Sequence, residues 1–417
     1  MLKHTIQNLK QITERYQTPF YLYDEARMLD NAQKLNAAFT WNNDFKEYFA
    51  VKANPNPYIL KLLKNQGFGM DCSSLPELLL AEKCGLAGED IMFSSNNTPI
   101  EEFAKAIELG AIINLDDINH IDFLKQHLSL PELICFRYNP GNQRTGSTII
   151  GYPEEAKFGF TRDQLFAGYR LAKDYGIKRF GIHAMIASNE LEPSYFIETA
   201  EMLFKLVKEI STDIGIKFEF VNIGGGIGIP YRPDEQAVDL NVISEGIKNS
   251  YKSHIEANNQ APLKLYMECG RMITGPYGYL VTKVRHIKQT YKNFAGLDAC
   301  MANLMRPGIY PNAYHHITVL GKEDLVHDIL YDVTGSLCEN NDKFAIDRKL
   351  PQLDIGDIVI IHDVGAHGHT MGFNYNGKLR SAELLLRKNG EIVEIRRAET
   401  IDDHFATLDF DGLARFI

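Results

Sequence analysis

Short apolar runs recur along residues 25–275, and amphipathic stretches separate them. The runs lie at 47–51, 68–71, 91–94, 112–115, 133–138, 180–186, 218–223 and 264–268. Between two of them, residues 192–214 place Phe196, Leu203 and Ile210 on one helical face. Residues 25–40 supply a further amphipathic helix ahead of the first run. Eight strands alternating with helices predict an α/β fold, a (β/α)8 TIM-like barrel that begins with its helix.

The pattern changes after about residue 278, where strands follow one another with little helix between them. The predicted strands lie at 279–287, 328–333, 357–363 and, as a hairpin around Asn389-Gly390, at 381–387 and 391–397. We therefore expect a barrel domain over 25–278 and a C-terminal antiparallel β domain over 279–417. The N-terminal segment 1–24 contains a predicted strand at 18–24, which we expect to join the β domain.

The composition and net charge of the chain argue against several classes of function. The 417 residues are 45% hydrophobic and 24% charged, as in ordinary globular proteins. A net charge of −10 makes nucleic acid and anionic membranes unexpected partners. Residues 1–5 lack the apolar core of a signal peptide, and no run has the length of a membrane span. The six cysteines form no CxxC pair, so we expect a reduced, cytoplasmic protein with no metal site.

Polar residues gather at the ends of the predicted barrel strands, where barrel enzymes carry their active sites. They are Lys52, Asp71, Asp116, Arg137, His183, Ser188, Gly224, Gly225, Gly226, Glu268 and Arg271. Each also has a structural interpretation. Lys52 could be a strand-end lysine that reaches solvent, Asp71 and Asp116 could be helix N-caps, Arg137 could form an ion pair, and the glycines could be a plain loop.

Three of these features together favour one cofactor. A lysine at the mouth of a buried strand can act as a nucleophile toward carbonyls. Successive glycine N–H groups directly after an apolar strand can form a phosphate site. A carboxylate, Glu268, can keep a pyridine nitrogen protonated. A lysine, a phosphate nest and a carboxylate at neighbouring strand ends match the needs of pyridoxal 5'-phosphate.

Five motifs resemble those of the fold-type III pyridoxal-phosphate-dependent decarboxylases, most closely the diaminopimelate decarboxylases. In chain order they are Phe49-Ala50-Val51-Lys52-Ala53-Asn54, Gly224 to Gly228, Glu268-Cys269-Gly270-Arg271, Arg306-Pro307-Gly308-Ile309-Tyr310 and Cys338-Glu339. The resemblance spans nearly the whole chain. It implies a barrel with a C-terminal β domain, as in alanine racemase and ornithine decarboxylase, and a homodimer with active sites at the interface.

The resemblance also implies residue roles. Lys52 and Cys338 are expected to be catalytic, with Lys52 holding the cofactor aldehyde and the Cys338 thiol delivering a proton to Cα after CO2 leaves. The expected cofactor-binding residues are Lys52, Asp71, Arg137, His183, Ser188, Gly224, Gly225, Gly226, Glu268, Gly270, Arg271 and His367. The expected substrate-binding residues are Arg271, Arg306, Tyr310, Glu339 and His367.

Four positions depart from the family pattern. Met185 stands where the family has a histidine that stacks on the cofactor ring; a thioether can pack on a ring but cannot supply charge. Ala187 replaces a glycine and Cys269 a proline. His367 replaces a tyrosine near the phosphate or substrate. These changes indicate a diverged subgroup.

We expect decarboxylation of meso-2,6-diaminopimelate to L-lysine, because Arg271 and Arg306 offer two forked donors for carboxylates. The alternatives are a decarboxylase of another amino acid or polyamine precursor, of the carboxynorspermidine, ornithine or arginine type, and a non-catalytic relative that binds a partner. An alanine-racemase-like enzyme is disfavoured by Glu268, because racemases place arginine at the pyridine nitrogen. A metal-dependent barrel enzyme is disfavoured because no His/Asp cluster has ligand-like spacing.

Overall fold

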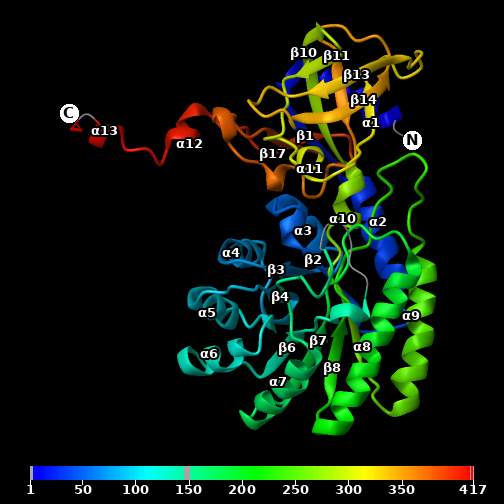
Figure 1. Cartoon of the computed structure of the whole chain (residues 1–417), viewed down its shortest axis with the longest axis vertical. Coiled ribbons are helices and arrows are strands. Elements are labelled where there is room, and N and C mark those ends of the chain that lie inside the picture. The colour runs from blue at the N-terminus through cyan, green and yellow to red at the C-terminus, as the bar shows by residue number, and fades with distance from the viewer. Residues whose placement is uncertain (1–2, 145–150, 414, 417) are drawn as a thin grey trace. The chain divides into compact units, whose positions relative to one another are not determined.

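The computed structural model describes residues 3–144, 151–413 and 415–416. The chain divides into two compact units (Figure 1). One unit, the barrel unit, comprises Arg27–Pro230 and Asp234–Thr274. The other, the sheet unit, comprises Met1–Ala26, Tyr231–Pro233 and Gly275–Ile417.

The barrel unit contains the predicted closed parallel barrel. Its strands are β2 (Lys46–Ala50), β3 (Gly69–Cys72), β4 (Ile91–Ser94), β5 (Ile112–Leu115), β6 (Leu133–Arg137), β7 (Arg179–His183), β8 (Phe218–Asn222) and β9 (Lys264–Met267). The barrel closes where β9 pairs with β2. These strands form from continuous apolar runs because a parallel strand is buried on both faces.

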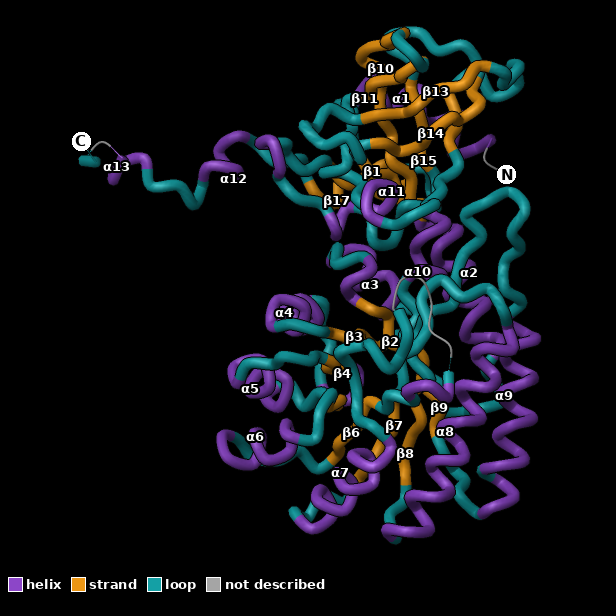
Figure 2. Tube along the Cα trace, in the orientation of Figure 1, coloured by secondary structure: helices purple, strands orange, loops and turns teal. Residues whose placement is uncertain are grey.

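Helices α3 to α9 surround the barrel strands (Figure 2). The helices of this part of the chain are α2 (Glu25–Ala38), α3 (Pro57–Lys64), α4 (Leu75–Lys83), α5 (Ile100–Glu108), α6 (Asn119–His127), α7 (Arg162–Asp174), α8 (Pro193–Ile214), α9 (Leu240–His254) and α10 (Arg271–Thr274). Local sequence sets several ends. Thr161 and Gln164 form a capping box at the start of α7, and Gly215, with φ +70°, ends α8.

Aromatic side chains from the neighbouring strands β8, β9 and β2 contribute to one buried cluster of the barrel. Tyr48, Phe220 and Tyr266 meet there, with the rings of Phe220 and Tyr266 stacked 4.6 Å apart. Gly181 on β7 makes room for this packing, because a Cβ at that position would lie 2.0 Å from the Phe220 ring. This packing holds the strands in fixed positions. The polar groups at their carboxyl ends are therefore held in fixed positions as well.

The sheet unit contains a nine-stranded sheet within its described residues. Its strands are β1 (Phe20–Asp24), β10 (Gly278–Gln289), β11 (Asn293–Leu297), β12 (Ile317–Val319), β13 (Ile329–Thr334), β14 (Lys343–Leu350), β15 (Ile358–Ile361), β16 (Ala382–Leu386) and β17 (Ile392–Arg396). The predicted N-terminal strand joins this sheet as β1, between β10 and β16. The sheet is not purely antiparallel, since β1 runs parallel to β16 and β11 runs parallel to β13.

Short helices complete the sheet unit. They are α1 (Lys3–Arg15), α11 (Arg306–Ile309), α12 (Ile401–Phe405) and α13 (Phe410–Leu413). Helix α1, which the sequence analysis did not predict, places Leu9 and Ile12 in the same buried cluster as Phe20 and Leu384. The expected hairpin turn is present between β16 and β17, where Gly390 adopts φ +85°.

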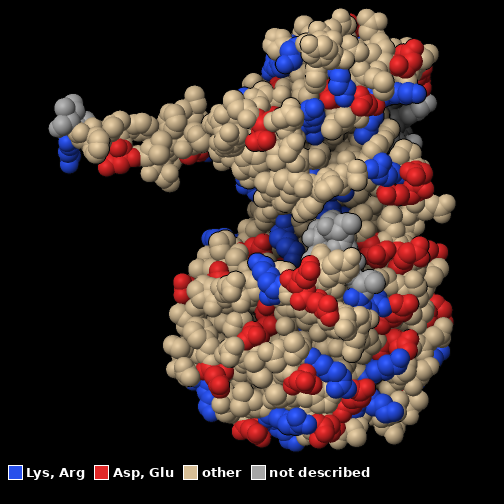
Figure 3. All heavy atoms as spheres, viewed as in Figure 1, with Lys and Arg blue, Asp and Glu red and all other residues tan. Residues whose placement is uncertain are grey.

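Two surface properties bear on the expected partners. Among the described residues, the longest helices are too polar or too short to cross a bilayer. Basic and acidic side chains are interspersed over the face drawn in Figure 3, with no broad field of one sign.

Candidate active site

Lys52 lies on a tight turn at the carboxyl end of β2. The strand ends at Ala50, and a single 3-10 turn over Val51–Ala53 follows, with Val51 and Ala53 buried and Lys52 exposed. Asn56 then caps α3 by accepting the N–H of Tyr58. The turn directs the ammonium group away from the packed strand. Lys52 is therefore not desolvated by the barrel, and its electrostatic partners are carboxyl groups, including Asp71 and Glu268.

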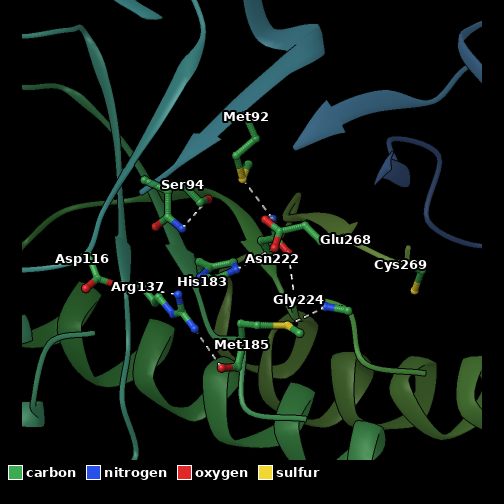
Figure 4. A network of polar contacts seen from close by, with 12 residues as sticks. Met92, Ser94, Asp116, Arg137, His183, Met185, Asn222, Gly224, Glu268 and Cys269 are labelled. Carbon is green, nitrogen blue, oxygen red and sulfur yellow. Dashed lines mark hydrogen bonds and ion pairs between the residues drawn. The ribbon is translucent and has the colours of Figure 1, made fainter. Parts of the chain in front are cut away.

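Glu268 lies within a network of polar contacts at the barrel mouth (Figure 4). It is 6% exposed, its Oε2 lies 3.0 Å from Nε2 of His183, and its Oε1 accepts the Asn222 side-chain N–H at 2.7 Å. Burial alone would raise the pKa of Glu268, but His183, Lys52 and Arg137 together hold that pKa below its ordinary value. Glu268 is therefore a buried carboxylate, and each of its oxygens keeps capacity for a further hydrogen bond.

Asn222 was missed by the sequence analysis. It is the last residue of β8 and is fully buried. Its Nδ2 contacts Glu268 and lies 3.1 Å from the sulfur of Met92, while its Oδ1 accepts the Gly224 N–H at 2.9 Å. Asn222 thus joins the glycine loop to the carboxylate. A polar residue at a strand end just before three glycines was the available signal.

The three glycines after β8 are required by close backbone packing. A Cβ would lie 2.3 Å from the Ala184 carbonyl oxygen at Gly224, 2.1 Å from the Glu268 carbonyl oxygen at Gly225, and 2.5 Å from the Ala187 carbonyl oxygen at Gly226. Gly224 and Gly226 also have φ of +71° and +94°. Positive φ at two of the three positions is a backbone conformation that also occurs in loops that bind anions.

Met185 contacts this glycine loop. Its sulfur accepts the Gly225 N–H at 3.2 Å. The carbonyl oxygen of Met185 accepts an N–H of Arg137 at 3.2 Å, so the loop after β7 is held from two sides. His183 on β7 is buried, and Ser188 further along is half-buried.

Arg137 and Asp116 form an ion pair, with Nη1 and Oδ1 3.7 Å apart. The N-cap interpretation of Asp116 is wrong, because Ile118 occupies the N-cap position of α6. The N-cap interpretation of Asp71 is also wrong, because Ser74 precedes α4. Arg137 therefore supports the loop that carries Met185. The positive charge of Arg137 also lowers the pKa of Glu268.

The pKa values of Asp71 and Glu268 shift in opposite directions although the two groups interact. Burial raises the pKa of Asp71 well above its ordinary value, the charge of Glu268 raises it further, and Lys52 opposes both effects. Asp71 is therefore the one of the two carboxyl groups whose neutral form is favoured. Gly270, also expected at the site, packs against the lysine turn: a Cβ there would lie 2.7 Å from the Cβ of Ala53.

Arg271, the first residue of α10 in the barrel unit, is 8% exposed. The sheet unit carries the remaining predicted residues. Arg306 is 8% exposed, its Nη1 donates to the Tyr314 carbonyl oxygen at 3.2 Å, and its guanidinium lies 3.8 Å from the centre of the Tyr231 ring. Tyr310 follows α11 and is half-buried. His367 adopts φ +54°, which is uncommon outside glycine.

Cys338 and Glu339 are exposed on a loop after β13. The Cys338 N–H donates to the Asn376 side chain at 2.8 Å, and the Asp342 carboxylate accepts the Leu337 N–H at 2.8 Å. A Cβ at Gly335 would lie 2.3 Å from that carboxylate. The sequence analysis missed both supports. Asp342 lies five residues beyond Leu337, whereas Asn376 lies 38 residues beyond Cys338 and reaches this loop only through folding.

The barrel residues fit pyridoxal phosphate. Lys52 is accessible, the glycine loop offers a cradle that no Cβ narrows, and Glu268 is an ionised carboxylate rather than a neutral acid. Nδ1 of His183 and Oδ1 of Asp71 are buried without a hydrogen-bond partner in the described part of the chain. Both atoms belong to residues at the carboxyl ends of barrel strands, so a bound cofactor could supply their missing partner.

Comparison with known proteins agrees with this arrangement. Residues 26–275 match the pyridoxal binding domain of the pyridoxal-dependent decarboxylases. Protein TabA of Pseudomonas amygdali pv. tabaci is 45% identical over 98% of this chain and 95% of its own length. Diaminopimelate decarboxylase of Methanothermobacter thermautotrophicus is 34% identical over 94% of this chain and 92% of its own.

A solved structure extends the likeness to the whole fold. The crystal structure of diaminopimelate decarboxylase from Methanocaldococcus jannaschii superposes with a TM-score of 0.88 at 31% identity, over 96% of this chain and 94% of that one. The expected fold class and cofactor are confirmed. The chain belongs to the pyridoxal-dependent decarboxylases, carboxy-lyases that act on amino acids, and its cofactor is pyridoxal phosphate.

Proposed function

We propose that this enzyme decarboxylates meso-2,6-diaminopimelate to L-lysine and CO2, the last step of lysine biosynthesis. The observation that carries the proposal is the buried guanidinium of Arg306, fixed on the Tyr231 ring and the Tyr314 carbonyl. A substrate with one carboxylate loses that group as CO2, whereas diaminopimelate keeps a second one for an arginine to hold. Relatives named diaminopimelate decarboxylase, 30–34% identical to this chain, support the same substrate.

The chemistry divides between cofactor and protein. Bound pyridoxal phosphate supplies the electron sink for the electron pair that CO2 leaves behind. Lys52 would hold the cofactor through its amine, and the loop at Gly224 to Gly226, where close packing excludes a Cβ, would lie against its phosphate. Glu268, whose pKa is lowered by His183 and Lys52 despite burial, would accept a hydrogen bond from the protonated pyridine nitrogen. Arg271 and Tyr310 assist in binding the substrate.

Proton delivery belongs to Cys338. Its thiol returns one proton to Cα after CO2 has left, and Glu339 holds the distal ammonium group of the substrate. Both residues are exposed on their loop, which supports a homodimer in which each chain supplies them to the other's site. The positive φ of His367 supports a binding role for that side chain, because strained backbone concentrates at functional positions.

A second candidate is a decarboxylase for a different amino acid. Two observations favour it: the identity with TabA, whose name states no substrate, exceeds that with the diaminopimelate decarboxylases, and Met185 and His367 replace family residues. Neither replacement removes Lys52, Glu268 or Cys338. The reaction class is therefore the same in both candidates, and only the recognised side chain differs.

A substrate panel distinguishes the two. Purified protein loaded with pyridoxal phosphate is given meso-diaminopimelate, LL-diaminopimelate, ornithine, arginine and lysine, and CO2 release is measured. We expect meso-diaminopimelate to have a kcat/KM at least tenfold above the others. An Arg306→Met variant should raise KM for that substrate, because the carboxylate loses its partner. A faster reaction with any other amino acid would reject the proposed substrate and leave the second candidate.

A further inference from the structure

Glu47 is a buried carboxyl group that the site described above does not use. It is the second residue of β2, five positions before Lys52, and it is 1% exposed. Its Oε1 accepts the backbone N–H of Cys269 at 2.5 Å, and its Oε2 has no hydrogen-bond partner in the described part of the chain. A carboxyl group is costly to bury, so its presence beneath the barrel mouth calls for a specific role.

The bond from Cys269 exists because Cys269 stands where the family motif has proline. Proline has no N–H and restricts its own backbone and that of the residue before it. Cysteine brings both a free backbone and a buried donor, which must find an acceptor. Glu47 supplies that acceptor. The cysteine that replaces the proline and the Glu47 carboxyl group on β2 are therefore the donor and the acceptor of one hydrogen bond.

The turn at Cys269 connects the carboxylate to the lysine. Glu268 precedes Cys269, and Gly270 follows it. A Cβ at Gly270 would lie 2.7 Å from the Cβ of Ala53 and 3.3 Å from that of Ala50. The turn is thus packed directly against the segment that presents Lys52, and a shift of Cys269 moves Glu268 relative to that segment.

We propose that Glu47 is a positioning residue, which fixes the main chain at Cys269 and thereby holds Glu268 in place for the pyridine nitrogen of the cofactor. This proposal rests on the role given to Glu268 above. It does not depend on which amino acid the enzyme decarboxylates. Glu47 touches neither cofactor nor substrate and acts only through the turn.

The charge state of Glu47 agrees with this role. Burial raises its pKa well above the ordinary value; the Cys269 N–H opposes this rise, and the charge of Glu268 adds to it. Burial therefore favours the neutral form of Glu47, whose carbonyl oxygen can still accept the N–H. The neutral form adds no second negative charge beside Glu268, whose pKa is lowered.

A double-mutant cycle tests the proposal in the full-length protein. Glu47→Gln and Glu47→Leu are each made alone and in a Cys269→Pro background. Three quantities are measured: the dissociation constant of pyridoxal phosphate, the ¹⁵N resonance of the labelled pyridine nitrogen, and the exchange rate of the residue-269 amide in the cofactor-free protein. The last measurement needs neither cofactor nor substrate, so it is separable from failure of the proposed function.

Glutamine keeps an uncharged acceptor, so Glu47→Gln should bind the cofactor within about threefold of the unchanged protein. Leucine leaves the Cys269 N–H without an acceptor. We expect at least tenfold weaker cofactor binding, a shifted ¹⁵N resonance and faster exchange at the Cys269 amide. In the Cys269→Pro background the donor is gone, so Glu47→Leu should weaken binding by less than threefold.

Three results would overturn the proposal. The first is an equal effect of Glu47→Leu in both backgrounds, including failure to fold in both. The second is a glutamine variant as weak as the leucine variant, which would mean that the charge of Glu47 matters and not its acceptor. The third is an unchanged ¹⁵N resonance and an equally slow Cys269 amide in Glu47→Leu.

Discussion

Removing the side chain of Asn222 should loosen the site more than removing a comparable buried asparagine. Asn222→Ala deletes the amide that donates to Glu268 at 2.7 Å and the oxygen that accepts the Gly224 N–H at 2.9 Å. Asn114 on β5 is a matched control, since it is also buried in the barrel and donates to the Ser94 hydroxyl at 2.9 Å. In the described part of the chain, Asn114 forms no hydrogen bond to the Glu268 carboxylate.

The magnitudes follow from the two sets of contacts. A hydrogen bond to a charged group contributes about 1.5–3 kcal/mol, and a buried N–H left without an acceptor costs about 1–3 kcal/mol. Asn222→Ala should therefore lower the free energy of unfolding of the barrel by at least about 2.5 kcal/mol. Asn114→Ala loses one neutral hydrogen bond and should cost about 1 kcal/mol.

Urea unfolding of the cofactor-free protein provides the assay. Trp41 is the single tryptophan of the chain, lies in the barrel unit and donates to the Ser244 hydroxyl at 2.9 Å, so its fluorescence reports on that unit. The free energies are compared at a common urea concentration within the transitions. An Asn222→Ala variant that loses no more stability than Asn114→Ala would refute the interpretation of Asn222 as the link between the glycine loop and Glu268.

Three further outcomes are expected. Cys338→Ala should slow turnover at least a hundredfold and leave the absorbance of the bound cofactor unchanged; equal turnover in a steady-state assay would exclude the thiol as the proton donor. A mixture of Lys52→Ala and Cys338→Ala chains should regain activity by subunit exchange, whereas proven exchange without activity would show that each site uses one chain. The lowered pKa of Glu268 contributes stability that is present above its unfolded pKa of about 4.3 and is lost as the pH falls through the folded pKa. Glu268→Gln should therefore flatten the acid side of a stability-versus-pH curve, and an equally steep curve would contradict that pKa shift.

The barrel could be predicted because its strands are short, continuous apolar runs. Strands buried on both faces leave this signal whatever their neighbours are. β7 ends at His183, before the predicted limit at 186, because the apolar residues Ala184 and Ile186 continue past the last ladder pair into a packed loop. At residues 184 and 186 the hydrophobic side chains indicate burial, whereas the pairing of β7 with its neighbours has already ended at His183.

Several elements of the sheet unit could not be predicted in the same way. β12 has three residues, and β14 (Lys343–Leu350) carries charged and exposed positions along its length. The parallel pairing of β1 with β16 joins segments at opposite ends of the chain. Neither edge pairing nor long-range register is encoded in local periodicity.

The candidate site could be predicted as a set of residues but not as a set of contacts. Lys52, Glu268 and the glycines were found from their places at strand ends. Asn222 was missed, and the structural interpretation of Asp116 as a helix N-cap, which was left open beside a functional role, is wrong because Ile118 occupies that position. The contacts between strand-end groups depend on how the barrel closes and on the direction of each side chain. Neither property can be deduced from the order of residues along the chain.

The most direct test of the account is to locate the cofactor's covalent attachment. Protein loaded with pyridoxal phosphate is reduced with borohydride and digested, and the peptides are sequenced by mass spectrometry. The account predicts a cofactor adduct on the peptide that contains Lys52 and its absence from a Lys52→Ala variant. An adduct on another lysine, or a loaded protein that yields none, would contradict the assignment of Lys52.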